Sequence, residues 1–265
     1  MFARFKALAG AGAIATALLG ATALDASAAS IVALVDGKTL VTIDPKTRKA
    51  TGKVEISGAG PILGIDVRPA DGMLYGIAAD GNIVTIDAKS GKATMKSKLG
   101  EAWEKGVTTS FDFNPAADRL RLMSSKGISY RINVDDGMVT KDGSHKYKDG
   151  DANAGKTPQV VAGAYTNSVK EKPKTTTLYN IDAATGALVS QNPPNDGVLN
   201  TIGALGMPVS GPVAFNIVSM GEDKNEAWLV TGGSLYSVDL KTGKATMAGK
   251  LEGVSGTVSD IAWMD

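Results

Sequence analysis

A short pattern recurs along this chain of 265 residues, and it constrains the fold more than any other feature. It reads T-L-V-T-I-D-P-K-T-R-K-A-T at 39–51, N-I-V-T-I-D-A-K-S-G-K-A-T at 82–94 and S-L-Y-S-V-D-L-K-T-G-K-A-T at 234–246. Two degenerate copies lie between them, at 128–140 and 177–189. A repeat at this distance is typical of propellers, solenoids and other modular arrays.

Each copy carries an Asp or Asn at the same place, and the spacing of these anchors gives the size of one module. The spacings are 43, 46, 49 and 57 residues between the anchors Asp44, Asp87, Asn133, Asp182 and Asp239. In the second unit, apolar or alternating segments separated by Gly-containing turns fall at 62–68, 73–78, 82–87 and 92–99. Such segments indicate strands joined by hairpins. The sequence therefore predicts five modules of four antiparallel strands.

The two ends of the repeat region complete one another. Residues 30–35 read as a second strand with no first strand before it, and 258–263 read as a first strand with no second strand after it. Pairing them would close a ring and remove the free sheet edges. We therefore predict an all-β, five-bladed β-propeller, a single domain over 29–265. An open β-solenoid or a sandwich is the alternative, and repeats near this length favour the propeller.

The first residues indicate export. Two basic residues precede an apolar stretch at 7–24, and small residues at 26–28 form the small-x-small pattern that a signal peptidase requires. We therefore predict a signal peptide at 1–28 and a periplasmic or secreted protein. A transmembrane anchor is the alternative, but Gly20 and Asp25 interrupt the stretch.

Charge and composition exclude several classes of partner. Without 1–28, the chain has 26 basic and 26 acidic residues, so nothing suggests electrostatic capture of nucleic acid or of an anionic membrane. No cysteine is present, which excludes a disulfide framework. The expected partner is a protein or a small-molecule ligand, with no integral membrane segment after removal of the signal.

One loop resembles a calcium-binding loop. Oxygen-bearing side chains stand at every second position at Asp149, Asp151 and Asn153, in a loop with glycines. The match is incomplete, because Ala154 and Val160 stand where an EF-hand requires a glycine and a glutamate. A plain turn, in which these side chains bond to nearby backbone amides, is the alternative. Calcium is the one candidate cofactor.

The innermost strand of each predicted blade is the second place where polar residues gather. Aligning the units puts Asp66, Asp112 and Asn216 in register, with Ala262 in the closing blade and Thr166 in the fourth. If these side chains face the axis, the carboxylates converge where their repulsion requires a cation, a shared proton or an arginine. The alternative is that they bond to neighbouring backbone and act as structural pins between blades.

Two places further along the same strands stand Arg68 and Asn114. The predicted ligand-binding set is therefore Asp66, Arg68, Asp112, Asn114 and Asn216. On the strand that follows, Arg119 and Arg121 are expected to pair with Asp112 or Asp118. The lone histidine, His145, is expected in a solvated loop.

Several motifs together resemble a known family. They are the segments 63–69, 111–115 with 118–121, 150–155, and 191–197 with 199–203. In this order they resemble the bacterial domain-of-unknown-function family 4394, over nearly all of the chain after the signal. The resemblance implies an exported propeller-type domain, and it implies no established activity and no catalytic residues.

Two functions remain open at this point. The first is a non-enzymatic binding or interaction module, favoured because the motifs supply no nucleophile with an adjacent base. The chain has one histidine, no cysteine and no Gly-x-Ser-x-Gly turn. The second is a calcium-dependent hydrolase or lyase with its site in the central channel, which rests on analogy of fold alone.

Overall fold

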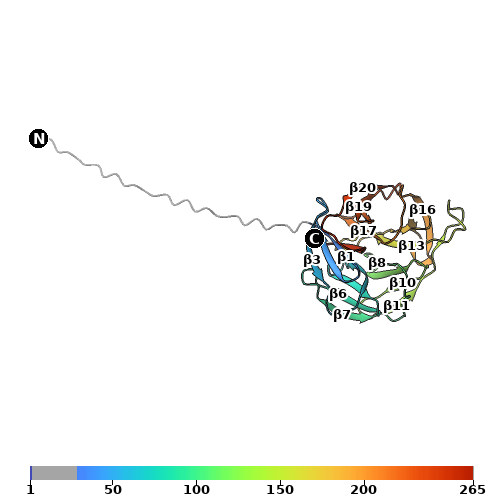
Figure 1. The fold of residues 1–265 in the computed structure, drawn as a ribbon. Coiled ribbons are helices and arrows are strands. Elements are labelled where there is room, and N and C mark those ends of the chain that lie inside the picture. The colour runs from blue at the N-terminus through green and yellow to red at the C-terminus, as the bar shows by residue number, and fades with distance from the viewer. Residues whose placement is uncertain (2–28, 265) are drawn as a thin grey trace.

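The computed structural model describes Met1 and residues 29–264, so the predicted signal peptide lies, apart from Met1, outside the described residues. Over these residues the chain forms five β-sheets arranged around a common centre (Figure 1). Strands β8, β13 and β17 lie toward the middle, and β7, β11, β16 and β20 lie toward the rim. The predicted five-bladed propeller is confirmed.

The blades follow one another along the chain, and each is described from its inner to its outer strand. Blade 1 consists of β21 (Val258–Met264), β1 (Ser30–Val35), β2 (Thr39–Ile43) and β3 (Ala50–Glu55). Blade 2 consists of β4 (Ile62–Val67), β5 (Leu74–Ala78), β6 (Asn82–Ile86) and β7 (Ala93–Lys98). Blade 3 consists of β8 (Thr109–Asn114), β9 (Arg119–Ser124), β10 (Ser129–Ile132) and β11 (Val139–Lys141).

The last two blades differ in their outer edges. Blade 4 consists of β13 (Val160–Tyr165), β14 (Leu178–Asp182), β15 (Ala187–Gln191), β16 (Val198–Ala204) and β12 (Lys146–Tyr147). Blade 5 consists of β17 (Val213–Ser219), β18 (Asn225–Thr231), β19 (Ser234–Val238) and β20 (Ala245–Lys250). The short β12 pairs with β16 in parallel and extends the four-stranded plan of blade 4 by one strand. A 3-10 helix, η1 (Pro194–Asp196), precedes β16.

The ring closes as predicted, because the first and last strands of the described chain pair. Strand β1 runs antiparallel to β21, with Ile31 opposite Trp263 and Ala33 opposite Ile261. The five inner strands β4, β8, β13, β17 and β21 contact one another in cyclic order. No inner strand therefore leaves a free edge to pair with another chain.

The hydrophobic core is divided into five clusters, and each cluster fills the space between two neighbouring blades. Between blades 2 and 3, for example, Tyr75 and Ile77 pack against Phe113 and Leu120. Both faces of most sheets are therefore covered, and β5 is buried along its whole length. This explains why several strands read as continuous apolar runs rather than as strict alternation.

The anchor residues of the repeat hold the turn between the third and fourth strands. The backbone N–H groups two and three places after Asp44 donate to its Oδ1, and the same two bonds form at Asp87 and Asp239. These bonds lower the pKa of each of the three carboxyls. The repeat is therefore a turn signal, which explains its recurrence without any shared chemistry.

The fourth anchor departs from this plan, and here the predicted alignment was wrong by one strand. Asp182 ends β14, which is the second strand of blade 4 and not the third. The side chain is fully buried, and it accepts hydrogen bonds from the backbone N–H of Gln159 and from the Tyr147 hydroxyl. An anchor one strand early explains the long 57-residue spacing to Asp239.

Within the described part of the chain, no helix has both the length and the apolar character that crossing a membrane requires.

Candidate functional site

Three buried aspartates on inner strands link neighbouring blades near the axis of the ring. The backbone N–H of Ile65 donates to Asp260 Oδ2 over 2.9 Å, and that of Phe113 donates to Asp66 Oδ2 over 2.9 Å. The N–H of Tyr165 donates to Asp112 Oδ1, also over 2.9 Å. Each carboxyl thus receives a bond from the next blade. This is the pinning arrangement that the sequence left open as an alternative, and Asp260 is a member that was not predicted.

A glycine makes one of these contacts sterically feasible. A Cβ at Gly64 would lie 2.6 Å from Phe111 Cβ and 3.1 Å from Asp260 Oδ2. Both distances are shorter than ordinary van der Waals contact, so a side chain at Gly64 would push Asp260 away from Ile65. Gly64 therefore allows blades 1, 2 and 3 to approach closely at the axis.

The axial carboxyls are held in a protonation state different from that of surface aspartates. Burial raises the pKa of Asp66 to about 7, against the opposing hydrogen bonds from Phe113 and Asn216. Burial, followed by repulsion from Asp66, raises the pKa of Asp112 well above its usual value. The pKa of Asp260 also rises, mainly through burial. The predicted convergence of carboxylates is present, and raised pKa values are its consequence.

A cavity of about 330 Å³ opens where the inner strands end, and two predicted ligand-binding residues line it. Asp66 comes from blade 2 and Asn216 from blade 5, and Asn216 Nδ2 donates to Asp66 Oδ1 over 3.3 Å. Trp263 of blade 1 lines the wall, while Ser168 and Lys170 of blade 4 complete it. The cavity therefore brings together side chains from four blades, with two buried polar groups among them.

The register of the fourth blade differs from the prediction. Asp66 accepts the N–H of Phe113, the residue after Asp112, and Asp112 accepts the N–H of Tyr165, the residue after Ala164. The residue of β13 in register with Asp66 and Asp112 is therefore Ala164. Thr166, which was expected there, follows the end of β13 and exchanges hydrogen bonds with Thr177. The fourth blade therefore contributes an apolar side chain to the level of Asp66.

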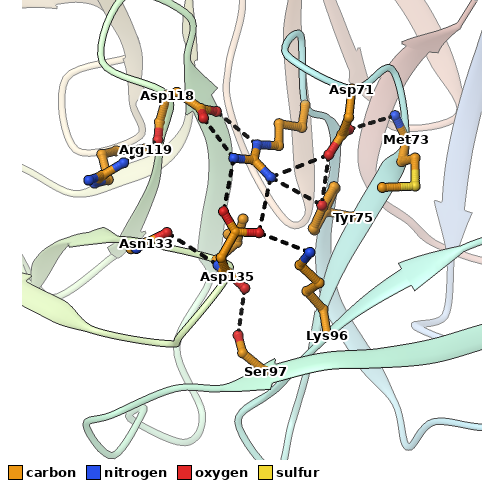
Figure 2. Close-up of polar contacts among 11 residues, drawn as sticks. Asp71, Met73, Tyr75, Lys96, Ser97, Asp118, Arg119, Asn133 and Asp135 are labelled. Carbon is orange, nitrogen blue, oxygen red and sulfur yellow. Dashed lines mark hydrogen bonds and ion pairs between the residues drawn. The ribbon is translucent and has the colours of Figure 1, made fainter.

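Arg68 lies apart from the axial aspartates, in an ion-pair network between blades 2 and 3. Its guanidinium donates to Asp118 at 2.8 and 2.6 Å, and it lies 3.3 Å from both Asp71 and Asp135. Figure 2 shows this network, with Lys96 on the far side of Asp135 and Tyr75 beside Asp71. The Arg68 side chain is only 11% exposed. Arg68 thus cross-links two blades and does not line the cavity.

The pKa values around Arg68 shift in the opposite direction from those at the axis. The hydrogen bonds from Arg68 lower the pKa of Asp118 below its usual value. Those from Lys96 and then from Arg68 lower the pKa of Asp135. Paired in this way, the two carboxyls stay ionised.

Asn114, the last of the five predicted ligand-binding residues, shapes a turn. Its Oδ1 accepts the backbone N–H groups of Ala116 and Ala117 at 3.0 and 2.9 Å. It does not line the axial cavity. Of the five residues, the cavity therefore unites Asp66 and Asn216, with Asp112 on the adjacent inner strand.

The arginines on β9 have partners other than those expected. Arg119 donates to the carbonyl of Asp118. Arg121 is almost fully buried between blades 3 and 4, where it donates to Tyr165 Oη, Asn195 Oδ1 and the carboxylate of Asp142. The loop that carries Asn195 is thereby tied to blade 3.

In the calcium-like loop, Asp149 is exposed, and the side-chain oxygens of Asp151 and Asn153 accept hydrogen bonds within the protein. Asp151 accepts the backbone N–H of Thr201 at 2.7 Å and its hydroxyl at 2.6 Å, and also the N–H of Asn153 at 2.9 Å. Asn153 donates to Thr201 and accepts from Lys156. Among the described residues, no group of three or more His, Cys, Asp or Glu side chains is placed to hold a metal ion. The contacts with Thr201 dock the loop on β16, and only the bond from the N–H of Asn153 to Asp151 is of the local kind expected for a plain turn.

His145 was expected in solvent, and this expectation was wrong. The side chain is buried, and within the described chain neither ring nitrogen has a hydrogen-bond partner. Burial, and secondarily the charge of Arg121, lowers its pKa to about 4. The following β12 buries Tyr147 against blade 4, which draws the polar segment inward.

A second cavity, of about 660 Å³, opens at the opposite end of the ring and was not predicted from the sequence. All five blades contribute, and apolar side chains such as Ile62, Val161 and Val213 make up much of its wall. Its residues stand at the starts of the inner strands. A Pro or a Val precedes several of these strands in the sequence, and this pattern could have indicated the second cavity.

Comparisons with solved structures show likeness of fold. A structural genomics protein of unknown function from Bacteroides thetaiotaomicron aligns with a TM-score of 0.50 and 14% identity, over 82% of this chain and 54% of that chain. A protein of unknown function from Bacteroides caccae aligns with a TM-score of 0.44 and 11% identity, over 85% of this chain and 73% of that chain. At such low identity the likeness concerns the fold alone. No curated protein matches the chain.

A comparison with family models gives a specific result. The model of a domain of unknown function, DUF4394, matches residues 39–262. This range runs from β2 into β21 and therefore includes part of every blade. The chain belongs to the DUF4394 family, which its sequence motifs resemble.

Proposed function

We propose that this protein is an exported, non-enzymatic binding protein whose small-molecule ligand occupies the cavity at the ends of the inner strands. The observation that carries the proposal is the hydrogen-bonded pair of Asp66 and Asn216 in that cavity. Ligand sites are typically concave and combine apolar walls with a few oriented polar groups. The cavity has this character, since Trp263 and Ile217 stand beside the polar pair.

The rigidity of the surrounding ring supports a binding role. Asp66 is fixed by the N–H of Phe113, and Asn216 is fixed by Asp66. A site that is held in place before the ligand arrives loses less entropy on binding. Inner strands from separate blades therefore provide a preformed site.

The groups around the cavity support binding rather than catalysis. A hydrolase or lyase would need an acid and a base that both reach the ligand. The other charged residues that line the cavity are Lys170, which is exposed, and Asp71, which Arg68 and Tyr75 already engage. Asp66 is thus the single buried titratable group available to a ligand.

Export is part of the same proposal and rests on the sequence. The basic start, the apolar stretch and the small residues at 26–28 support a periplasmic or secreted location. Detection of a mature chain beginning near Ala29 in the periplasm or the medium would test it. Retention of residues 1–28 in the mature protein would contradict it.

A blocked cavity tests the binding role even while the ligand is unidentified. Ala70 is exposed at the turn that lines the cavity, so Ala70→Trp should cover its mouth while leaving the core intact. Ala117, exposed in the corresponding turn of blade 3, supplies the matched control Ala117→Trp. Thermal melting would be followed with a panel of sugars, amino acids, amines and organic acids.

The expected result is that at least one compound raises the melting temperature of the wild type and of Ala117→Trp, but not of Ala70→Trp. The compound should be recovered chemically unchanged. Equal stabilisation of Ala70→Trp would place the ligand elsewhere and contradict the proposal. Conversion of the compound to a product would contradict its non-enzymatic part.

A further inference from the structure

The acidic side of the axial cavity has no counter-charge. Asp66 lines the cavity, and Asp112 and Asp260 lie close enough to interact with it electrostatically. No ion pair among the described residues includes any of these three aspartates. An anion in the cavity would meet this group of carboxyls, so the charge favours a cation.

A second acceptor is oriented toward the same space. Asn216 lines the cavity, and its residue is only 7% exposed. Its Nδ2 donates to Asp66, while its Oδ1 receives no hydrogen bond from any described residue. A ligand with several N–H donors would satisfy this oxygen and the carboxylate together.

An aromatic side chain in the same cavity lining suits an organic cation. Trp263 lines the cavity and stacks on Trp228, with ring centroids 6.4 Å apart. The face of an indole attracts a cation and packs against methylene groups. Lys170 is the basic residue of the cavity lining, and because its side chain is exposed, solvent screens its repulsion.

A metal ion fits this site less well than an ammonium group. Each oxygen of Asp66 already accepts one N–H donor, so the carboxylate has few positions left for a metal ion. Calcium needs six to eight oxygen ligands, and the described residues contain no cluster that is placed to supply a metal site. An ammonium group needs only acceptors, which Asp66 and Asn216 provide.

We infer that the axial cavity binds a small organic ammonium ion, with its N–H donors directed at Asp66 and Asn216 and its aliphatic part against Trp263. This inference rests on the proposed binding function and specifies the ligand class. A cavity of about 330 Å³ suits a compound the size of a short-chain amine or an amino acid derivative without a free carboxylate.

Three probes of one size and different charge test the inference: pentylammonium, 1-pentanol and pentanoate. Each is titrated into the protein at pH 8 by calorimetry, and tryptophan fluorescence reports on Trp263. We expect pentylammonium to bind at least about tenfold more tightly than 1-pentanol, because a charge-assisted hydrogen bond is lost in the alcohol. Pentanoate should not bind.

Two matched variants separate the cavity from the axis as a whole. In Asp66→Asn the amide oxygen can still accept the N–H of Phe113, but the charge is lost, so pentylammonium affinity should fall at least about tenfold. Asp112→Asn changes a buried axial aspartate that does not line the cavity. It should keep the affinity, because the carboxyl that it removes does not line the cavity.

Binding should also strengthen between pH 6 and pH 8. The groups that bear on this dependence are Asp66, Asp112 and Asp260 on the inner strands and Asp71 and Lys170 at the mouth. Ammonium binding requires the ionised carboxylate of Asp66, which burial makes scarce below neutral pH.

The outcomes distinguish this inference from the proposed function. If pentylammonium and 1-pentanol bound with equal affinity and Ala70→Trp blocked both, the inferred preference for a cation would be overturned. The cavity would then be a binding site for neutral ligands. Ammonium binding that survives Asp66→Asn unchanged would also overturn the inference. Absence of binding by all three probes would overturn it too, and the wider panel with Ala70→Trp would then decide the function separately.

Discussion

Two groups of three aspartates lie on blades of this propeller, and they differ in one respect. Around Arg68, the carboxyls of Asp71, Asp118 and Asp135 converge on a guanidinium. At the axis, Asp66, Asp112 and Asp260 converge without a cation and accept backbone N–H groups instead. The pKa falls at Asp118 and Asp135 and rises at all three axial aspartates. Burial raises the pKa at the axis, whereas the hydrogen bonds from Arg68 and Lys96 lower the pKa of the more exposed carboxyls around Arg68.

The two groups of aspartates therefore have different roles in the molecule. The Arg68 group is saturated, so its contribution is the cross-link between blades 2 and 3. The axial group is bonded well enough to hold the blades together, and it has carboxyls without a cationic partner beside a cavity. The expected effects that follow run from the largest to the smallest.

Removing the cation from the Arg68 group should have the largest effect. In Arg68→Met, Asp71 and Asp118 would lose the cation that they bind, and Asp135 would keep only Lys96. We expect a loss of about 3 kcal/mol in the free energy of unfolding, at the lower end for breaking a buried ion pair because Asp118 and Asp135 are partly exposed. Urea denaturation measures it.

Arg119→Met is the matched control for this variant. Arg119 is exposed and bonds only to the carbonyl of Asp118 among the described residues, so its loss should cost less than about 0.5 kcal/mol. If both variants lost the same stability, the ion pairs around Arg68 would not be what separates the two groups.

The axial group should make the free energy of unfolding depend on pH. Because the pKa of Asp66 is raised to about 7, the folded protein holds a proton that the unfolded chain releases above about pH 4. Stability from this group is therefore complete at low pH and is lost as pH rises through 7. Between pH 5 and pH 7 the loss should be about 2 kcal/mol.

The measurement is the difference between the wild type and Asp66→Asn in urea denaturation at several pH values. The difference is needed because His145 titrates in the same range with the opposite sign, as described below. Asp118 and Asp135, with lowered pKa values, stay ionised throughout this window and do not contribute. Parallel stability curves for the two proteins would show that Asp66 ionises normally.

His145 tests whether a buried group without a counter-charge stays neutral elsewhere in the molecule. Its pKa is lowered to about 4, so below its ordinary value near 6.5 the unfolded chain binds a proton that the folded protein does not. Stability is lost as pH falls. His145→Phe should therefore be more stable than the wild type by about 2 kcal/mol at pH 5.

The same substitution should be nearly neutral at pH 8. Neither ring nitrogen of His145 has a partner among the described residues, so a phenyl ring of similar shape removes no hydrogen bond there. Marked destabilisation at pH 8 would indicate that the imidazole makes a polar contact, for example through a bound water.

The sequence predicted the ring much better than it predicted these two groups of aspartates. Turn signals and apolar strands recur locally, so five blades and the pairing of 30–35 with 258–263 could be read from spacing alone. Asp66, Asp112 and Asn216 were found because they share a register. Asp260 was missed because it stands outside the aligned register and accepts the N–H of Ile65. The other blades have no aspartate at the corresponding position.

Long-range partners explain the other differences. Arg68 meets Asp118 and Asp135 from a different blade, and no local pattern carries a contact across 50 or 67 residues. Asp182 matched the repeat, although it stands one strand early in a blade with a long insertion. The burial of His145 likewise depends on β12 joining a sheet that forms later in the chain.

Weakening the repulsion within the axial group should have a smaller effect. Asp112→Asn keeps an oxygen for the N–H of Tyr165 but removes a charge that interacts with Asp66. Repulsion from Asp66 contributes to the raised pKa of Asp112, and the two carboxyls titrate as a pair, so the pH at which the stabilisation from the pair is lost should move down. The effect should be about 1 kcal/mol at neutral pH. An unchanged midpoint would mean that the two carboxyls are not coupled.

Calcium should have the smallest effect, and it tests whether any acidic group on this protein needs a metal ion. The oxygens of Asp151 and Asn153 are already engaged by Thr201, Lys156 and backbone amides. The axial aspartates accept backbone N–H groups of neighbouring blades. Calcium needs six to eight oxygen ligands, and no cluster of the described residues is placed to supply them, so its addition or chelation should change the free energy of unfolding by less than about 0.5 kcal/mol. A rise in melting temperature that Asp149→Asn abolishes would restore the metal site at the loop, and one that Asp66→Asn abolishes would place the metal at the axis.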